Sequence, residues 1–157
     1  AYKSLIDAGI PEEKIILAGE SAGGGLYSNC DDYILLVDAL ANGGIGKNGY
    51  RVLSEESIEK IKTPQLNVLM QGNFIASHLK IGYSYGLGVR TLIDKGYGAR
   101  TPIGEFAWDA MTGGYGLVDT ENHIAVIYMQ NVENCTYAWR NIFPETRDLI
   151  YEALEIE

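Results

Sequence analysis

The segment from residue 83 to residue 131 constrains the fold most, because strand-like runs alternate there with polar or glycine-rich turns. The runs 83–92 and 123–131 are rich in apolar, β-branched and aromatic residues, which is typical of buried strands. The polar residues 119–123 form a turn between two of the runs. We therefore expect an antiparallel meander of strands at 83–92, 103–112, 114–119 and 123–131.

Helical patterns flank this meander. Tyr33, Leu36, Val37 and Leu40 have the spacing of an amphipathic helix, which predicts a helix over 29–42 that ends at two glycines. A second helix is expected to begin at Ser54 and end at Pro64, and a third to follow Pro144 with its inward face at Ile150, Ala153 and Leu154. Residues 64–80 are interpreted as a loop or irregular strand, and the apolar run 14–18 as an extra strand of a sheet. The fold class is α+β: an antiparallel sheet with packed helices.

The composition of the chain limits the kinds of partner, location and bound group that we expect for it. The 157 residues suggest one domain, and a net charge of −9 argues against nucleic acid and membrane partners. No apolar run is long enough for a membrane span, and the N-terminal residues do not resemble a signal peptide, so we expect a cytoplasmic location by default. Cys30 and Cys135 are interpreted as buried, reduced thiols. Neither a metal site nor a cofactor is expected, since the two histidines and two cysteines lack ligand spacing.

The pattern Trp108-x-x-x-x-Gly113-x-Tyr115-x-x-Val118-Asp119, followed by a turn and an apolar strand, carries a resemblance. It is similar to the third active-site motif of the class C β-lactamase and penicillin-binding-protein-like serine hydrolases. The resemblance implies that Trp108, Asp109 and Ala110 occupy the Lys/His/Trp-x-Gly strand at the edge of the active site, with alanine where the family has glycine. It also implies that the backbone N–H of Met111 faces the substrate oxyanion.

The same resemblance extends over residues 23–155, through the runs Gly23–Ser28, Asp31–Tyr33, Leu40–Gly44 and Arg51–Ser54. It implies a partial β-lactamase/transpeptidase-like fold in a domain at 23–157. The implied reaction is acyl-enzyme hydrolysis of a β-lactam, a D-alanyl peptide or a small ester.

In the family, the Ser-x-x-Lys and Tyr-x-Asn elements precede the region that this chain matches. The chain's own short matches to these patterns are interpreted as chance or structural, namely Ser57-Ile-Glu-Lys60, Ser77-His-Leu-Lys80 and Tyr27-Ser-Asn29. In particular, Lys60 is expected to be a solvated surface cation, because it lies on a charged helix.

A different resemblance covers residues 1–26. Gly19-Glu-Ser21-Ala-Gly23 has the form of a nucleophile elbow, and its surroundings resemble hormone-sensitive-lipase-like α/β-hydrolases. The resemblance implies a helix–strand–elbow segment at 1–22 with Ser21 as the candidate catalytic residue. The two resemblances meet at Gly23–Leu26, which indicates either a recombined or engineered chain or convergence over a short stretch.

Only His78 and His123 are available as a base for Ser21, and neither follows an aspartate in an α/β-hydrolase context. We therefore predict a structural role for Ser21. Three hypotheses result: a portion of a serine hydrolase that is inactive alone, a non-catalytic self-associating module, or a carboxylesterase that uses Ser21. The expected partners are a second copy of the chain, as a homo-oligomer or domain-swapped dimer, and a small-molecule substrate if the chain is active.

Overall fold

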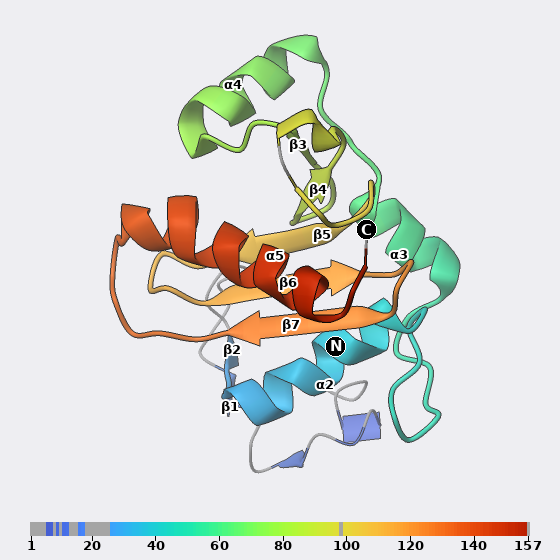
Figure 1. Cartoon of the computed structure of the whole chain (residues 1–157). Coiled ribbons are helices and arrows are strands. Elements are labelled where there is room, and N and C mark those ends of the chain that lie inside the picture. Colours follow the sequence, from blue (N-terminus) through green and yellow to red (C-terminus); the bar gives the residue numbers. More distant parts are fainter. Residues whose placement is uncertain are drawn as a thin grey trace.

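The centre of the molecule is a five-stranded antiparallel sheet in the order β3-β4-β5-β6-β7 (Figure 1). The computed structural model describes residues 6, 7, 9, 11, 12, 16, 17, 26–97 and 99–156. The strands are β3 (Tyr83–Tyr85), β4 (Arg90–Leu92), β5 (Phe106–Asp109), β6 (Tyr115–Asp119) and β7 (Ile124–Tyr128). Each strand pairs with its sequence neighbour, so the predicted meander and the α+β fold class are confirmed.

The segment 83–92 was predicted as one strand, and that prediction is wrong: it is the β3–β4 hairpin. The backbone N–H of Gly86 donates to the carbonyl of Val89 at 2.8 Å and closes the turn. Gly88 has a φ of +82°, which is the left-handed region that favours glycine. The Gly-Leu-Gly sequence at 86–88 therefore reverses the direction of the chain, although the apolar pattern of the segment predicts one continuous strand.

The two faces of the sheet are covered by different helices. On β6, Tyr115 and Leu117 belong to the core beneath the C-terminal helix, whereas Val118 belongs to the core beneath α2 (Cys30–Ala41). This alternation is the period of two expected of a strand buried on both faces. In Figure 1 the C-terminal helix lies in front of the sheet, and α2 lies on its other side next to β7.

The helix α2 confirms the prediction for 29–42. The side chain of Asn29 caps it by accepting from the backbone N–H of Asp32 at 3.0 Å. Its contact with the sheet is centred on Val37 and Ala41, one turn apart, and both are buried. Tyr33, in the first turn of the helix, is 41% exposed, although its ring reaches β6 beside Gly116.

Two more helices precede the sheet. Ser54 caps α3 (Glu55–Lys62) as predicted. The segment 64–80 was predicted as loop or irregular strand, but it contains the helix α4 (Val68–His78), capped by Asn67. Only Phe74 of α4 is buried, so the helix produces no amphipathic pattern in the sequence.

The C-terminal helix α5 (Phe143–Ala153) follows a π-helical turn, η3 (Ala138–Ile142). The predicted inward face is right at Ile150, which packs against the core beneath the helix, and wrong at its other two positions. Ala153 and Leu154 are exposed, and the buried positions are Phe143, Arg147 and Tyr151, spaced by four residues. Because two of these three residues carry polar groups, the spacing of apolar residues in the sequence does not identify this inward face.

Near the N-terminus, β1 (Ile16–Leu17) pairs with β2 (Leu26–Tyr27) in a separate two-stranded antiparallel sheet. The prediction that 14–18 joins a sheet is therefore confirmed at Ile16–Leu17, the part of that run that the structure describes. The elbow Gly19–Gly23, with Ser21, lies outside the described residues. Both cysteines are free thiols, as predicted, but Cys30 is exposed rather than buried because it occupies the first turn of α2.

Among the described residues, no helix has the length and apolar character to cross a membrane. The same part of the chain contains no group of three or more histidine, cysteine or carboxylate side chains arranged for a metal ion.

Candidate functional site

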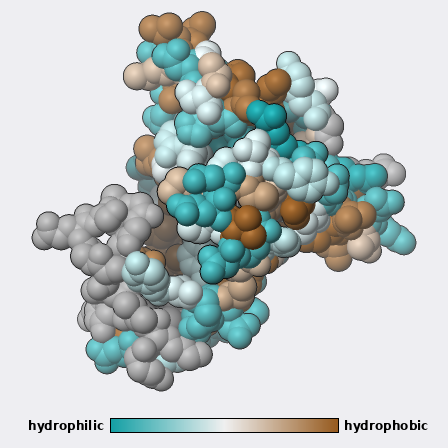
Figure 2. Space-filling model, turned by 90° about the vertical axis from the view of Figure 1, so that its left-hand side faces the viewer, coloured by the Kyte–Doolittle hydropathy of each residue, from teal (hydrophilic) through white to brown (hydrophobic). Residues whose placement is uncertain are grey.

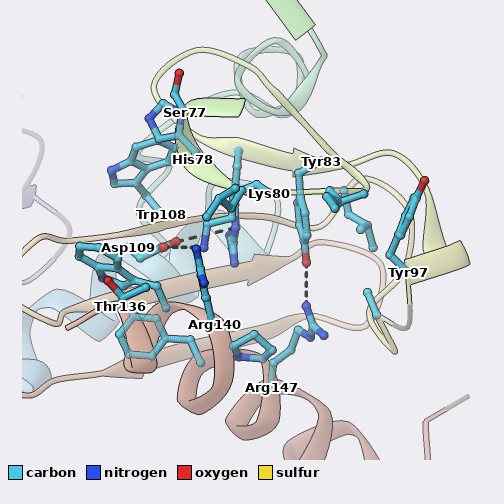
Figure 3. Close-up of a pocket in the computed structure, with 18 of the residues that line it drawn as sticks. Ser77, His78, Lys80, Tyr83, Tyr97, Trp108, Asp109, Thr136, Arg140 and Arg147 are labelled. Carbon is cyan, nitrogen blue, oxygen red and sulfur yellow. Dashed lines mark hydrogen bonds and ion pairs between the residues drawn. The ribbon is translucent and has the colours of Figure 1, made fainter. Parts of the chain in front are cut away.

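A cavity of about 880 Å³ lies between the end of α4, the strands β3–β5 and the η3–α5 helix (Figure 3). Residues 77–81 line one side, the strands form the floor, and residues 134–147 line the opposite side. The cavity is lined by both tryptophans of the chain, Trp108 and Trp139. Its size suits a small organic ligand, since ligand pockets measure about 300–1,000 Å³.

The end of β5 supplies the residues that the sequence singled out. Trp108 and Asp109 are the last two residues of the strand, and pairing with Gly116 and Tyr115 of β6 holds them in place. Trp108 is 38% exposed at the cavity wall, where its ring lies 5.4 Å from that of Tyr85 in an edge-on contact. This arrangement presents an aromatic wall beside a carboxylate.

The chain then turns at Ala110 and Met111. The backbone N–H of Ala110 donates to the carbonyl of Gly114 at 2.7 Å, and the carbonyl of Ala110 accepts from Nε1 of Trp139 at 3.3 Å. Asn134 donates to the carbonyl of Met111 at 2.8 Å, but within the described residues the N–H of Met111 has no hydrogen-bond partner. Met111 lines the cavity and Ala110 does not.

Thus three of the four residues assigned to substrate binding from the sequence, Trp108, Asp109 and Met111, lie at one cavity. Ala110 contributes through its carbonyl, which fixes Trp139 on the opposite wall. The free N–H of Met111 is the type of group that stabilises a developing oxyanion, because backbone N–H groups are already oriented when the reaction occurs.

A cluster of buried charges forms part of the cavity lining. Nζ of Lys80 is 2.6 Å from Oδ2 of Asp109, and Nε of Arg90 is 3.8 Å from Oδ1 of the same carboxylate (Figure 3). On its other side, Nη1 of Arg90 is 3.9 Å from Oε1 of Glu105. The Arg90 guanidinium also lies 4.7 Å from the centre of the Tyr83 ring, which is cation–π geometry.

Burial and charge shift the ionisation of this cluster. Burial lowers the pKa of Lys80, and the neighbouring Arg90 charge lowers it further, while Asp109 opposes both effects. Burial raises the pKa of Glu105, and Arg90 opposes this. For Arg90, burial disfavours the charge, but the electrostatic effect of Glu105 and of its other neighbours outweighs burial and raises its pKa. Arg90 is therefore a fixed positive charge in the cluster.

Tyr83 and Arg147 join the hairpin to α5 beside this cluster. Nη1 of Arg147 donates to Oη of Tyr83 at 2.7 Å, and the remaining nitrogens of Arg147 bind Asp148. Burial raises the pKa of Tyr83 to about 12. This contact holds α5 over the floor of the cavity.

The serine–lysine pairs found in the sequence do not form catalytic pairs. Ser57 is hydrogen-bonded to the hydroxyl of Ser54, and Lys60 pairs with Glu56 at the surface, as predicted. Ser77 lines the cavity, but its hydroxyl donates to the carbonyl of Asn73 and points away from Lys80 in Figure 3.

Among the residues that the structure describes, neither histidine is paired with a carboxylate, and His78 contacts the carbonyl of Phe74. His123 lies within 3.2 Å of the carbonyl of Ala41. Asp109 binds Lys80, and Asp119 accepts hydrogen bonds from Tyr151 and from the β6–β7 turn. Neither aspartate therefore orients His123 as a base.

Sequence reasoning did not identify the cationic side of the site, to which Lys80, Arg90, Arg140 and Arg147 contribute. Lys80 and Asp109 are 29 residues apart, and only the tertiary fold brings them together. The available indication was Asn67, whose position before Val68–Met70 fits a helix cap and would have suggested α4.

Comparison with known proteins agrees with the fold. No protein-family model matches the chain. The protein Rv1367c of Mycobacterium tuberculosis is 28% identical over 123 residues, which are 73% of this chain and 29% of that protein. An uncharacterized protein, MT1414, from another strain of M. tuberculosis matches equally. The chain therefore spans less than a third of the length of these curated relatives.

Two solved structures are also similar. EstCE1, described as a hydrolase with promiscuous acyltransferase activity, superposes with a TM-score of 0.63 at 18% identity, over 81% of this chain and 30% of that one. A LovD6 variant of simvastatin synthase from Aspergillus terreus gives 0.68 at 19% identity, over 87% and 37%. Both proteins belong to the β-lactamase/transpeptidase-like serine hydrolase superfamily. At these identities the likeness establishes the fold, which is β-lactamase-like.

Proposed function

We propose that residues 23–157 are the sheet-and-helix portion of a serine acyl hydrolase or acyltransferase, and that residues 1–22 are a separate segment preceding it. In this proposal the portion binds the acyl substrate and donates the Met111 N–H to its carbonyl oxygen. The reaction class is acyl-enzyme formation and hydrolysis or transfer, with a β-lactam, a D-alanyl peptide or a small ester as substrate.

One observation carries the proposal. Trp108, Asp109 and Met111, which match the family's active-site strand, line the same cavity, and the N–H of Met111 has no partner among the described residues. The fold shared with EstCE1 and simvastatin synthase supports the same reaction class.

We further propose that this chain does not turn over substrate alone. The cavity serine, Ser77, is bonded to a backbone carbonyl, and Lys80 is held by Asp109 rather than by a serine. A serine hydroxyl without an adjacent base is a weak nucleophile at neutral pH. The nucleophile would then come from another part of a longer protein.

Binding can be measured by fluorescence, because the only two tryptophans both line the cavity. Titration with a small ester, a D-alanyl dipeptide and a β-lactam should change the emission saturably for at least one of them. In Trp139→Phe the remaining signal reports Trp108 alone. Met111→Pro removes the N–H and should weaken binding by about tenfold, the loss of one hydrogen bond, whereas Met111→Ala keeps the N–H and serves as the control.

Two results would favour the alternatives. If none of the three ligands changes the emission, the chain is better explained as a non-catalytic module. If a chromogenic ester is hydrolysed and a fluorophosphonate probe labels Ser21, with both effects lost in Ser21→Ala, the chain is a carboxylesterase and the predicted structural role of Ser21 is wrong.

A further inference from the structure

Four rings beside the cavity contact one another in a closed circle, so that each ring touches two of the others. Phe74 and His78, one turn apart on α4, are stacked with their ring centres 4.9 Å apart. Phe74 also lies 5.7 Å from the ring of Tyr85 on β3. Trp108 on β5 completes the circle, because its ring lies 5.4 Å from Tyr85 and 5.8 Å from His78. Each distance lies within the range of about 4.5–7 Å that is typical of paired aromatic rings.

Phe74 is the base of this ring cluster. It is the one buried residue of α4, and it belongs to a core cluster with Tyr83. Trp108, by contrast, is 38% exposed at the end of its strand and lines the cavity. A partly exposed side chain changes rotamer readily unless its neighbours hold it. Tyr85 and His78 contact Trp108 from two other elements, and both of them rest on Phe74.

The same segment of the chain also holds the residue next to Trp108. Lys80, two residues after the end of α4, has its Nζ 2.6 Å from Oδ2 of Asp109 (Figure 3). The last two residues of β5 are therefore both in contact with α4 or with the residues that directly follow it. A helix that buries a single side chain thus contacts both of these site residues, which packing of the core alone does not require.

We propose that Phe74 is a positioning residue of the candidate site. It holds the Trp108 ring in the orientation that faces the ligand, and it acts through Tyr85 and His78. Neither Phe74 nor Tyr85 lines the cavity, so both affect a ligand only through the Trp108 wall. The inference rests on the proposed function, in which Trp108 belongs to the substrate-binding strand, and it adds α4 and β3 to the elements that determine ligand affinity.

The first test needs no ligand. In Trp139→Phe, Trp108 is the only tryptophan, so acrylamide quenching of the fluorescence reports the exposure of its ring. Adding Phe74→Leu should raise the quenching constant by about twofold, because a ring released from these contacts is no longer held at 38% exposure. Phe106→Leu is the matched control and should leave the constant unchanged. It removes an equally buried ring from β5 itself, but from the core beneath α2.

Tyr85 separates positioning from a general loss of stability. Tyr85→Phe keeps the ring and its contacts, so it should behave as the parent does, whereas Tyr85→Leu should raise the quenching constant as Phe74→Leu does. Because Tyr85 is only half-buried, this pair of variants tests the proposal even if Phe74→Leu does not fold. Equal quenching constants in Tyr85→Leu and Tyr85→Phe would overturn it.

The second test measures binding of phenyl acetate, D-alanyl-D-alanine and benzylpenicillin by calorimetry. Tyr85→Leu should weaken binding by about fivefold, the effect of losing one aromatic contact, and Tyr85→Phe should not. In a chain that already carries Trp108→Leu, adding Tyr85→Leu should cost nothing further, because the two residues act as one unit. Additive losses in the double variant would overturn the inference. If no ligand binds but the quenching constants change as expected, the proposed function fails while the positioning of Trp108 is supported.

Discussion

The hydroxyl of Tyr151 donates a hydrogen bond to Oδ2 of Asp119, joining α5 to the end of β6. Both side chains are fully buried. The same carboxylate accepts from the backbone N–H groups of Glu121 and Asn122, so it also forms the β6–β7 turn. One buried carboxylate therefore fixes both the turn and the helix that forms a wall of the cavity.

Tyr151→Phe should destabilise the protein by about 1–3 kcal/mol, because it removes a donor from a buried, charged acceptor. Tyr128→Phe is the control, since the Tyr128 hydroxyl makes only a 3.4 Å contact with Gln130 in a half-buried position. Urea unfolding followed by circular dichroism measures both variants. Equal losses of unfolding free energy would contradict the role assigned to the Asp119–Tyr151 contact.

Gly44→Ala should be far more destabilising than Gly49→Ala, although both glycines have positive φ, +85° and +79°. A Cβ at Gly44 would lie 2.0 Å from the carbonyl oxygen of Leu53, whereas a Cβ at Gly49 meets nothing within 4 Å. We expect a cost of roughly 1–2 kcal/mol at Gly49 from backbone strain alone and a larger cost at Gly44, where the chain must also move. Thermal unfolding of the two variants gives the comparison, and similar midpoints would refute it.

The parts of the fold predicted from the sequence are those with local determinants. The helix α2 is defined by the Asn29 cap and by the glycines after Asn42, and β6 and β7 by apolar runs around a polar turn. The helix α4 was missed because it buries little besides Phe74, so its apolar residues do not recur at a helical spacing. Most of the inward face of α5 was missed because Arg147 and Tyr151 are buried through polar partners on other elements.

The candidate site also has one part that the sequence predicts and another that it does not. Trp108, Asp109 and Met111 were found because they are consecutive or nearly so and follow a motif. The Lys80–Asp109 pair and the position of Arg140 depend on how α4, β5 and η3 pack, and no local pattern specifies that packing.

Stability should fall at alkaline pH because of Tyr83. Burial raises its pKa from 10.0 to about 12, so the folded state favours the neutral phenol. The stability that this contributes is complete below about pH 10 and is lost as the pH rises from 10 to about 12, on the order of 2 kcal/mol. Urea midpoints measured across this range test the effect.

Tyr83→Phe should flatten this alkaline loss, although it also removes the hydrogen bond from Arg147 and lowers stability near neutral pH. Tyr137→Phe, at an exposed tyrosine, should leave the pH profile unchanged. Some slope should remain in Tyr83→Phe, because burial also raises the pKa values of Tyr115 and Tyr151. An unaltered profile in Tyr83→Phe would be incompatible with this assignment.

Self-association of the chain is the last prediction, and we propose that α4 provides the contact. Val68, Leu69 and Met70 are 92%, 76% and 53% exposed, and Figure 2 shows apolar side chains at this end of the molecule. Residues 64–77 contain no charged side chain, so the net charge of −9 does not oppose close approach there. Two copies can bury these residues by pairing their α4 helices, as in a symmetric dimer.

Light scattering over a wide concentration range should therefore give a dimeric mass. Leu69→Glu should shift it to the monomer, because a carboxylate at the contact would have to be desolvated. Leu149→Glu on α5 is the control, since Leu149 is similarly exposed but lies among charged neighbours. A monomeric mass at every concentration would refute self-association. A dimer that persists in Leu69→Glu would instead indicate domain swapping, because exchanged elements remain paired without the α4 contact.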